Sequence, residues 1–485
     1  MKRPRRRTGA IVVLIGACMA LATIFVLEAR RRRGLYWYDV GSDYRFELTG
    51  GTAQRLPARI TANGFDFPAW DSPWSSAFLE VDVDSRVTAT WFEPSVEVVV
   101  DGTPACRQFF ERSASGKRHI NLCVQSGDVH AGARIDFRSR HIAIREQEAR
   151  LLLFPAPGLD SARILVLAPH ADDAEIAAFG LYAGRESWVV TITTGSYPGR
   201  KYAELAPDTA DRERLQARLR IHDSLVVPQW AGIDPDHVLN LGYYTGALAT
   251  MFAQPSRVIA NPVSGAEDME RWRSLNRSSF LPARRASSTW ASLVRDLTEL
   301  LASVRPTLIV APHPALDANP DHVFTTAALF DALASSEHQT AQLFLYTNHH
   351  VLSEYYPFGP SDAAVTLPPW LDSSVGFRSL YSHPLDDLTQ RDKLFALDQM
   401  HDLRPAPRRV TAGPVATFLN RIASMAAELW RDPVLEYSYY RRAVRPNELF
   451  FVYESSDVKT LRQVLPQQPS WTTQESADSV GTEIH

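Results

Sequence analysis

Cysteine is scarce in this chain and no Cys-x-x-Cys pair occurs: the 485 residues contain three cysteines. This scarcity excludes a cysteine-ligated zinc knuckle and a thioredoxin-type redox motif. An excess of positive charge is also absent, because the formal net charge is −4. That balance argues against a nucleic-acid partner, since nucleic-acid-binding proteins usually carry a basic domain. Hydrophobic residues make up 45% of the chain and charged residues 22%, a composition typical of a packed globular protein.

The N-terminus carries an apolar run between two groups of basic residues. The run extends from Gly9 to Leu27, and lysine and arginine cluster on both of its flanks. As a helix it would be roughly 28 Å long, close to the ~30 Å hydrocarbon core of a bilayer. Residues 1–33 are therefore predicted to form an N-terminal transmembrane helix that anchors the protein to a membrane.

The expected location depends on two signals near this anchor. Lysine and arginine are almost balanced across the apolar run, so their distribution does not fix the orientation. Cys106 and Cys123 flank two short strands around a turn; a hairpin would bring them within bridging distance, and two unpaired buried thiols are the alternative. Because disulfides belong to oxidising compartments, we expect a single-pass protein of the cell membrane whose body is periplasmic or extracytoplasmic.

Residues 34–155 show short alternating apolar runs separated by Gly, Ser, Asp or Pro, without helical periodicity. This spacing is typical of an antiparallel β-sandwich. The aromatic residues Trp70, Trp74 and Phe78 could stack on sugar rings, but packing between the two sheets is the preferred interpretation.

After residue 160 the pattern changes to alternating strands and helices. Strands are expected over 163–168, 188–193, 238–242, 307–311 and 342–346, and helices over 174–184, 208–226, 290–304 and 321–333. This alternation predicts an α/β domain over 161–455 with a mainly parallel sheet covered on both faces. Ligands of such sheets bind beyond the carboxyl ends of the strands.

Two segments lack a clear periodicity. Residues 251–288 are rich in Ser, Arg and Pro, and such a length without periodicity is unusual inside a compact domain. Two interpretations of this segment are equally favoured: a substrate lid and a disordered insertion. The polar tail 456–485 is expected to be disordered.

Histidine and aspartate gather after two of the predicted strands. The first group is His170, Asp172 and Asp173, and the second is His313, Asp317, Asp321 and His322. Two imidazoles and one carboxylate form a common catalytic zinc set that leaves one position open for water. An unligated carboxylate beside them can accept the proton of that water. Helix capping is the alternative role for Asp173 and Asp321.

The two groups resemble the signatures of a known family. The stretch "APHADDAEIAAFG" resembles the His-Pro-Asp-Asp signature of the PIG-L-like (N-acetylglucosaminyl de-N-acetylase) family, and "NPDHV" is similar to its His-Pro-Asp-His signature. The similarity covers Ser161 to Tyr346 and extends to the strand Glu448 to Glu454. The resemblance implies a Rossmann-like α/β fold and zinc-dependent hydrolysis of an N-acetyl group on an amino sugar.

The resemblance also implies residue roles. His170, Asp173 and His322 would be the Zn²⁺ ligands, Asp172 the general base, and Asp321 a residue that orients its neighbours.

The chain departs from the family pattern near the second signature. Asn319 stands where the family often has a histidine that acts as an acid or stabilises the oxyanion, and asparagine cannot supply a proton. Asp172, once protonated, or His313 could serve as the acid instead. Thr245 occupies a loop position where the family often has a sugar-contacting aspartate. Arg214 matches a substrate-contacting arginine, and a solvated helix face is the alternative for it.

The sequence thus predicts a membrane-anchored zinc de-N-acetylase acting on a GlcNAc-type sugar, glycan or glycolipid. A metal hydrolase of the same fold acting on another amide is one alternative. A catalytically inactive carbohydrate-binding protein is the other. Two imidazoles and a carboxylate also accept other divalent ions.

Overall fold

The structure is a computed structural model. It describes residues 34–51, 53–61, 64–197, 199–282, 285–336, 341–404 and 439–465, together with the single positions 16, 19 and 23. The apolar run Gly9 to Leu27 therefore falls almost wholly outside the described residues. Within the described ranges, no helix combines the length and the apolar composition needed to cross a bilayer. The predicted transmembrane anchor and single-pass membrane location are corrected accordingly, because they depended on a spanning helix and the described residues contain none.

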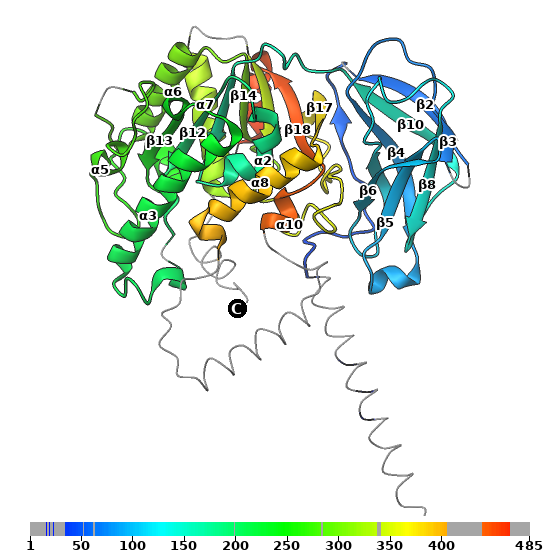
Figure 1. The fold of residues 1–485 in the computed structure, drawn as a ribbon, viewed down its shortest axis with the longest axis horizontal. Helices are drawn as coiled ribbons and strands as arrows, with labels where there is room; N and C mark the ends of the chain where they lie inside the picture. The colour runs from blue at the N-terminus through cyan, green and yellow to red at the C-terminus, as the bar shows by residue number, and fades with distance from the viewer. Residues whose placement is uncertain are drawn as a thin grey trace, which may run out of the picture.

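The N-terminal part forms two antiparallel sheets that pack face to face (Figure 1). The first sheet contains, in order, β2 (Gln54–Ile60), β10 (Gln147–Phe154), β4 (Ser76–Ser85) and β7 (Ser115–Asn121), with β9 (Ile142–Ile144) beside β4. The second contains β3 (Gly64–Asp66), β8 (Arg134–Arg140), β5 (Ser95–Val100) and β6 (Thr103–Phe109). Alternate side chains of each strand enter the space between the sheets, as the strand period of two requires.

The aromatic residues singled out from the sequence are packed in the interior. Trp74 is 2% exposed and Phe78 is fully buried. Trp70 is partly buried against the same core as Trp74, with its ring centroid 5.9 Å from that of Trp74. Packing between the two sheets, the preferred interpretation, therefore describes Trp70 and Trp74, whereas Phe78 is buried against the core of the C-terminal part.

The C-terminal part contains a seven-stranded sheet. Its order is β13 (Val238–Tyr243), β12 (Ser187–Thr193), β11 (Ile164–Ala168), β14 (Leu308–Pro312), β15 (Gln342–Tyr346), β18 (Asn447–Glu454) and β17 (Ser379–Pro384). The pairs from β13 to β15 are parallel, whereas β18 is antiparallel to both β15 and β17.

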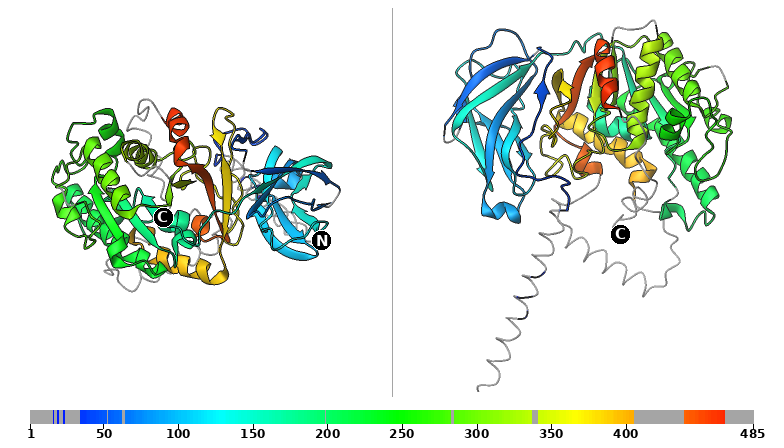
Figure 2. Two further views of the ribbon diagram at one scale, coloured as in Figure 1. Left: turned by 90° about the horizontal axis from the view of Figure 1, so that it is seen from above. Right: turned by 180° about the vertical axis from the view of Figure 1, so that it is seen from behind.

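Helices cover both faces of this sheet. Packed into the core on one face are α3 (Thr209–Val226), α4 (Leu248–Ala253), α6 (Trp290–Val304) and α7 (Pro320–Ser335). On the other face lie α2 (Asp173–Tyr182) and α8 (Asp387–Gln399), with α10 (Tyr439–Ala443) against them. The views from above and from behind show the sandwich beside this part, at the β17 end of the sheet (Figure 2).

The predicted fold class is corrected by this topology. The nine strands and helices expected within 161–346 occur within two residues of their predicted bounds. The chain as a whole, however, is mixed α/β with several antiparallel sheets, and the largest sheet itself ends in two antiparallel strands. A Rossmann-like, mainly parallel architecture is therefore not assigned. β17 and β18 come late in the chain and complete the sheet by antiparallel pairing. Such pairing needs no helical crossover connection, so the strand–helix alternation that predicts parallel strands does not extend to them.

The outer face of the first sandwich sheet is also buried. Phe78 on β4 pairs in register with Leu152 on β10, and both join the core of the seven-stranded part together with Phe154. Their neighbours Leu79 and Leu151 point to the sandwich interior instead. One sheet thus contributes to two cores through the alternation of its side chains.

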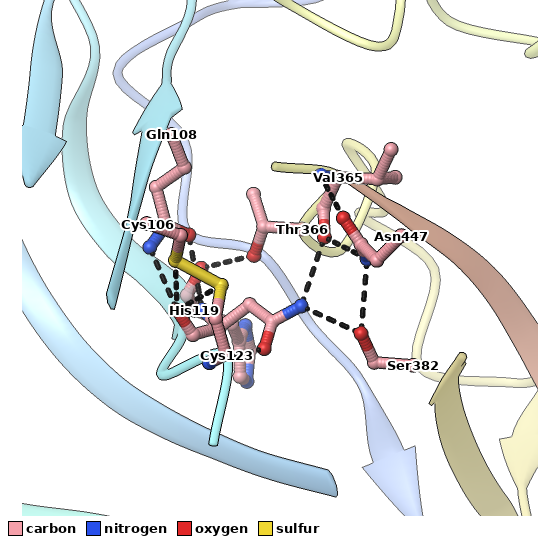
Figure 3. The surroundings of a disulfide bond; sticks show 9 residues. Cys106, Gln108, His119, Cys123, Val365, Thr366, Ser382 and Asn447 are labelled. Atoms are coloured by element: carbon pink, nitrogen blue, oxygen red, sulfur yellow. Dashed lines mark hydrogen bonds between the residues drawn. A yellow bond between two sulfur atoms is a disulfide. The ribbon is translucent and has the colours of Figure 1, made fainter. Parts of the chain in front are cut away.

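Polar contacts reinforce this junction (Figure 3). The Asn121 side-chain amide donates to the carbonyl of Val365 at 3.0 Å and to the hydroxyl of Ser382 at 2.9 Å. Asn447, from β18, donates to the same two acceptors at 3.0 and 2.9 Å. The hydroxyl of Thr366 donates to a sandwich carbonyl at 2.6 Å. The bonds of Asn121 and Thr366 fix the sandwich against the edge of the larger sheet, and those of Asn447 hold the acceptors in place.

Cys106 and Cys123 form a disulfide, which decides between the two alternatives left open by the sequence (Figure 3). Their Cα atoms are 6.2 Å apart and 17 positions separate them in the chain. Asn121 lies inside this closed loop, and Gln108 pairs with both the N–H and the C=O of Asn121. The cross-link therefore restrains the segment that presents Asn121 to the seven-stranded part.

Removing the disulfide is expected to destabilise the protein without altering its chemistry. A loop of this length contributes about 3 kcal/mol through the reduced entropy of the unfolded chain. Cys106→Ser combined with Cys123→Ser should lower the free energy of unfolding in urea by that amount. Reduction of the wild-type protein should reproduce the loss, and an unchanged denaturation midpoint in both experiments would contradict the expectation.

The segments without periodicity contain ordered structure among their described residues. Within 251–288, Trp272 is 5% exposed and Arg273 forms a buried ion pair with Asp296 at 2.8 Å, which differs from a disordered insertion. In the tail, Val458–Leu461 is helical and its Leu461 is 3% exposed. Residues 466–485 lie outside the described residues.

Candidate active site

The first loop of the site connects β11 to α2. The strand ends at Ala168, and α2 begins at Asp173 after only four intervening residues. Thr193, at the end of β12, donates to the carbonyl of Pro169 through both its N–H and its hydroxyl, at 3.0 and 2.9 Å. Asp172 has φ = 132°, a conformation that is uncommon and strained for a residue with a side chain. Such strain is concentrated at functional positions.

The second loop connects β14 to α7. Asn319 caps this helix by accepting a hydrogen bond from the N–H of Asp321 at 2.9 Å, and Pro320 occupies the first helical position. These are the residues that favour a helix start. β14 pairs with β11 in parallel, so the carboxyl ends of the two strands, and the two helix starts that follow them, meet at one edge of the sheet.

The two loops bring His170, Asp173 and His322 together. The Nδ1 of His170 lies 3.3 Å from the Oδ2 of Asp173 and 3.3 Å from the Nε2 of His322. The same Oδ2 lies 3.0 Å from the Nε2 of His322. Three ligands about 2.0–2.1 Å from a tetrahedral ion are separated by roughly 3.3 Å. The three side chains therefore form a group that can hold one metal ion.

Two further carboxylates orient the imidazoles. The Nε2 of His170 lies 3.1 Å from the Oδ2 of Asp321, which also accepts from the N–H of Gly246 at 2.8 Å. The Nδ1 of His322 lies 3.2 Å from the Oδ2 of Asp317. Each imidazole thus directs one nitrogen to a carboxylate and the other to the shared centre, as metal-binding histidines usually do.

The charges of the group favour a cation. Burial by itself lowers the pKa of His322, but the carboxylates of Asp173 and Asp317 outweigh burial and raise that pKa well above its ordinary value. Burial likewise raises the pKa of Asp173, and the two imidazoles reverse this and hold it well below the usual range. In addition, the buried Oδ1 of Asp321 has no hydrogen-bond partner. This donor set fits a divalent ion, which would take the place of the imidazole protons.

Asp172 lies beside the group and pairs with an arginine. The Arg220 guanidinium donates to its Oδ1 at 3.1 Å and to the carbonyl of Ala171 at 3.0 Å, and it also pairs with Asp402. Gly195 makes room for this arginine, because a Cβ there would lie 2.3 Å from the Arg220 Nε. The pKa of Asp172 is raised to about 6, because burial and the charge of Asp173 raise it by more than the positive charge of Arg220 lowers it.

The structure does not bring His313 to this group. The Nε2 of His313 lies 3.1 Å from the hydroxyl of Tyr453, and its ring packs against Phe377 and Phe451. Burial lowers its pKa to about 3. His313 is therefore held as a neutral imidazole in the core of the sheet.

The two predicted substrate contacts are placed differently. Thr245 donates to the hydroxyl of Thr193 at 3.2 Å and directly precedes Gly246, whose N–H binds Asp321. Thr245 thus lies at the edge of the site. Arg214 instead pairs with Asp211 three residues before it, on the solvent side of α3, where 38% of its side chain is exposed.

Sequence reasoning missed two residues of the site, Arg220 and Asn348. The Asn348 side chain donates to the Oδ1 of Asp173 at 2.9 Å. A signal for Asn348 was available, because it follows β15 at the same edge of the sheet as the two histidine loops. Arg220 sits in a long charged helix, and the sequence offers no sign of which arginine of α3 faces the site.

Fold and site together define a class: a mixed α/β protein whose parallel strands carry an imidazole and carboxylate cluster of metal-binding type at their carboxyl ends. Within this class, residues 165–333 match the family described as GlcNAc-PI de-N-acetylase, PIG-L. The match includes both signatures, confirms the resemblance to this family and supports a de-N-acetylase. No curated protein sequence matches the chain.

Solved structures give weaker likenesses. A40926 pseudoaglycone deacetylase Dbv21 is 17% identical, with 61% of this chain and 99% of that chain covered and a TM-score of 0.34. The zinc-inhibited form of teicoplanin deacetylase Orf2 is 17% identical, with 61% and 99% covered and a TM-score of 0.31. The hydratase GalB from Pseudomonas putida is 11% identical, with 60% and 95% covered and a TM-score of 0.27. Because these scores are low, the assignment depends on the family match.

Proposed function

We propose that the protein is a metal-dependent de-N-acetylase that removes the acetyl group from an N-acetylated amino sugar, with zinc as its ion. The observation that carries the proposal is the convergence of His170, Asp173 and His322 within 3.0–3.3 Å of one another, beside the buried carboxylate of Asp172. The PIG-L match over residues 165–333 supports the choice of reaction. An ion held by these ligands supplies Lewis-acid polarisation and activation of water.

The residues of the chain divide the remaining tasks. Asp172 accepts the proton of the attacking water, and Arg220 keeps its carboxylate in place through the contact at 3.1 Å. Asp317 and Asp321 hold the two imidazoles in the orientation that presents the ligating nitrogens. A buried carboxylate held in place by a hydrogen bond can act as a general base in this way.

Protonation of the leaving amine needs a different account from the family pattern. Asn319 uses its side-chain oxygen as a helix cap, so its amide nitrogen is the group that can donate to the developing oxyanion. His313 is held against Tyr453 and does not reach the leaving group. We therefore assign the return of the proton to Asp172, which alternates between base and acid. Thr245 remains a proposed contact to the sugar.

Acetate release from purified protein tests this function. We expect acetate from at least one of free GlcNAc, a GlcNAc oligosaccharide and a GlcNAc glycolipid. The activity should disappear after chelation and return with added zinc, because the ligands alone supply no Lewis acid. Hydrolysis confined to N-acyl compounds that are not sugars would support a different amidase. Binding of a GlcNAc glycan without any acetate release, in the presence of zinc, would contradict the proposal and favour a sugar-binding protein.

A further inference from the structure

Asn348 joins the two halves of the candidate metal site. It lies in the loop after β15 and is 6% exposed. Its side-chain amide donates to the Oδ1 of Asp173 at 2.9 Å and to the carbonyl of the same residue at 3.3 Å. Its main-chain N–H donates to Asp317 at 2.9 Å. Asn348 thus contacts both the candidate metal ligand Asp173 and Asp317, the carboxylate that orients His322.

The two oxygens of Asp173 have different surroundings. Oδ2 faces both imidazoles, 3.3 Å from the Nδ1 of His170 and 3.0 Å from the Nε2 of His322, and accepts from the N–H of His170 at 2.9 Å. Oδ1 accepts from the amide of Asn348. Only Oδ2 is therefore directed to the centre that an ion would occupy.

The main chain of Asn348 is itself held firmly. Its main-chain carbonyl accepts a hydrogen bond from the Arg442 guanidinium, which also pairs with Glu354 at 3.4 Å. Arg442 is 8% exposed. Because main-chain contacts fix Asn348 on both sides, its side chain can resist rotation of the Asp173 carboxylate.

We propose that Asn348 is a positioning residue that keeps Asp173 bound to the ion through one oxygen, so that one coordination position stays open for water and substrate. A free aspartate can bind a divalent ion through one or both oxygens, and a second oxygen would fill the open position that catalytic zinc sites retain. Hydrogen bonds to the non-ligating parts of metal ligands typically change metal affinity by 10–100-fold. This inference depends on the proposed function, because it concerns the ion of the same site.

The test uses the full-length protein loaded with Co²⁺, whose visible absorption is stronger in four-coordinate than in five-coordinate sites. Asn348→Ala should show weaker absorption than wild type and bind Co²⁺ at least about 10-fold more weakly. Asn348→Gln, which retains an amide donor, should lie closer to wild type in both measurements. Asn447→Ala removes a buried amide that makes three hydrogen bonds, two with the main chain of Val365 and one to Ser382. This control should leave both the absorption and the affinity unchanged.

The outcomes separate the two proposals. A wild-type spectrum and affinity in Asn348→Ala would overturn the role of Asn348 while leaving the metal site intact. Failure of the wild-type protein itself to bind Co²⁺ would contradict the proposed function. If Asn348→Ala does not fold, Asn348→Ser carries the same expectation, since its hydroxyl is too short to reach Asp173.

Discussion

Asp172→Asn is expected to lower kcat for acetate release by about 10²–10⁴-fold, the usual contribution of a general base. The variant keeps the shape of the side chain and an oxygen that can accept a hydrogen bond from Arg220. In the wild-type protein this arginine lies 3.1 Å from the carboxylate. It removes the ability to take a proton, together with the negative charge opposite Arg220. Because Asp172 is not among the three grouped ligands, the variant should retain its metal. Steady-state kinetics and elemental analysis on the same preparation measure both quantities.

Asp296→Asn provides a matched control for this variant. Asp296 is 3% exposed and pairs with Arg273 at 2.8 Å, so it shares with Asp172 both burial and an arginine partner. Its loss should reduce stability and leave kcat near that of wild type. A kcat for Asp172→Asn within a few-fold of wild type would mean that another group accepts the proton.

His322→Ala is expected to lose the metal and, with it, the activity. The variant removes one of three ligands and leaves the carboxylates of Asp173 and Asp317 without the imidazole that lies 3.0 and 3.2 Å from them. Loss of a residue that only orients a ligand weakens metal binding by up to about 100-fold. Loss of a ligand itself should weaken it by more than that. Equilibrium dialysis against zinc, followed by elemental analysis, gives the stoichiometry and affinity.

His383→Ala is the matched control for the loss of a buried histidine. His383 is 8% exposed, and its Nδ1 lies 2.9 Å from the hydroxyl of Tyr381 on β17. We expect it to bind zinc as the wild-type protein does. Circular dichroism of both variants shows whether the fold is kept, and equal zinc binding by His322→Ala and wild type would remove His322 from the site.

The part of the site that could be predicted from the sequence depends on local signals. Apolar runs define β11 and β14, and the residues after them start helices, so the loops that carry His170 and His322 can be placed from the chain alone. Their meeting follows from a parallel pairing of neighbouring strands, which the alternation of strands and helices predicts.

The rest depends on tertiary packing that the sequence does not reveal. His313 lies in the same loop as Asp317, yet its ring turns to Tyr453 and the aromatic core instead of the ion ligands. The antiparallel strands β17 and β18 pair with each other although more than 60 residues of chain separate them. Arg220 reaches Asp172 because α3 packs against β13 and Gly195 leaves space for the arginine, and no local pattern encodes that contact.

The central claim is that side chains from two loops share one divalent ion, and an anomalous difference map tests it most directly. Crystals of the zinc-loaded protein, measured above the zinc absorption edge, should show a peak about 2.0–2.1 Å from the Nδ1 of His170, the Nε2 of His322 and one oxygen of Asp173. The account would be contradicted if crystals of zinc-containing protein showed no peak at that position. It would also be contradicted if the zinc ion were bound only by other residues.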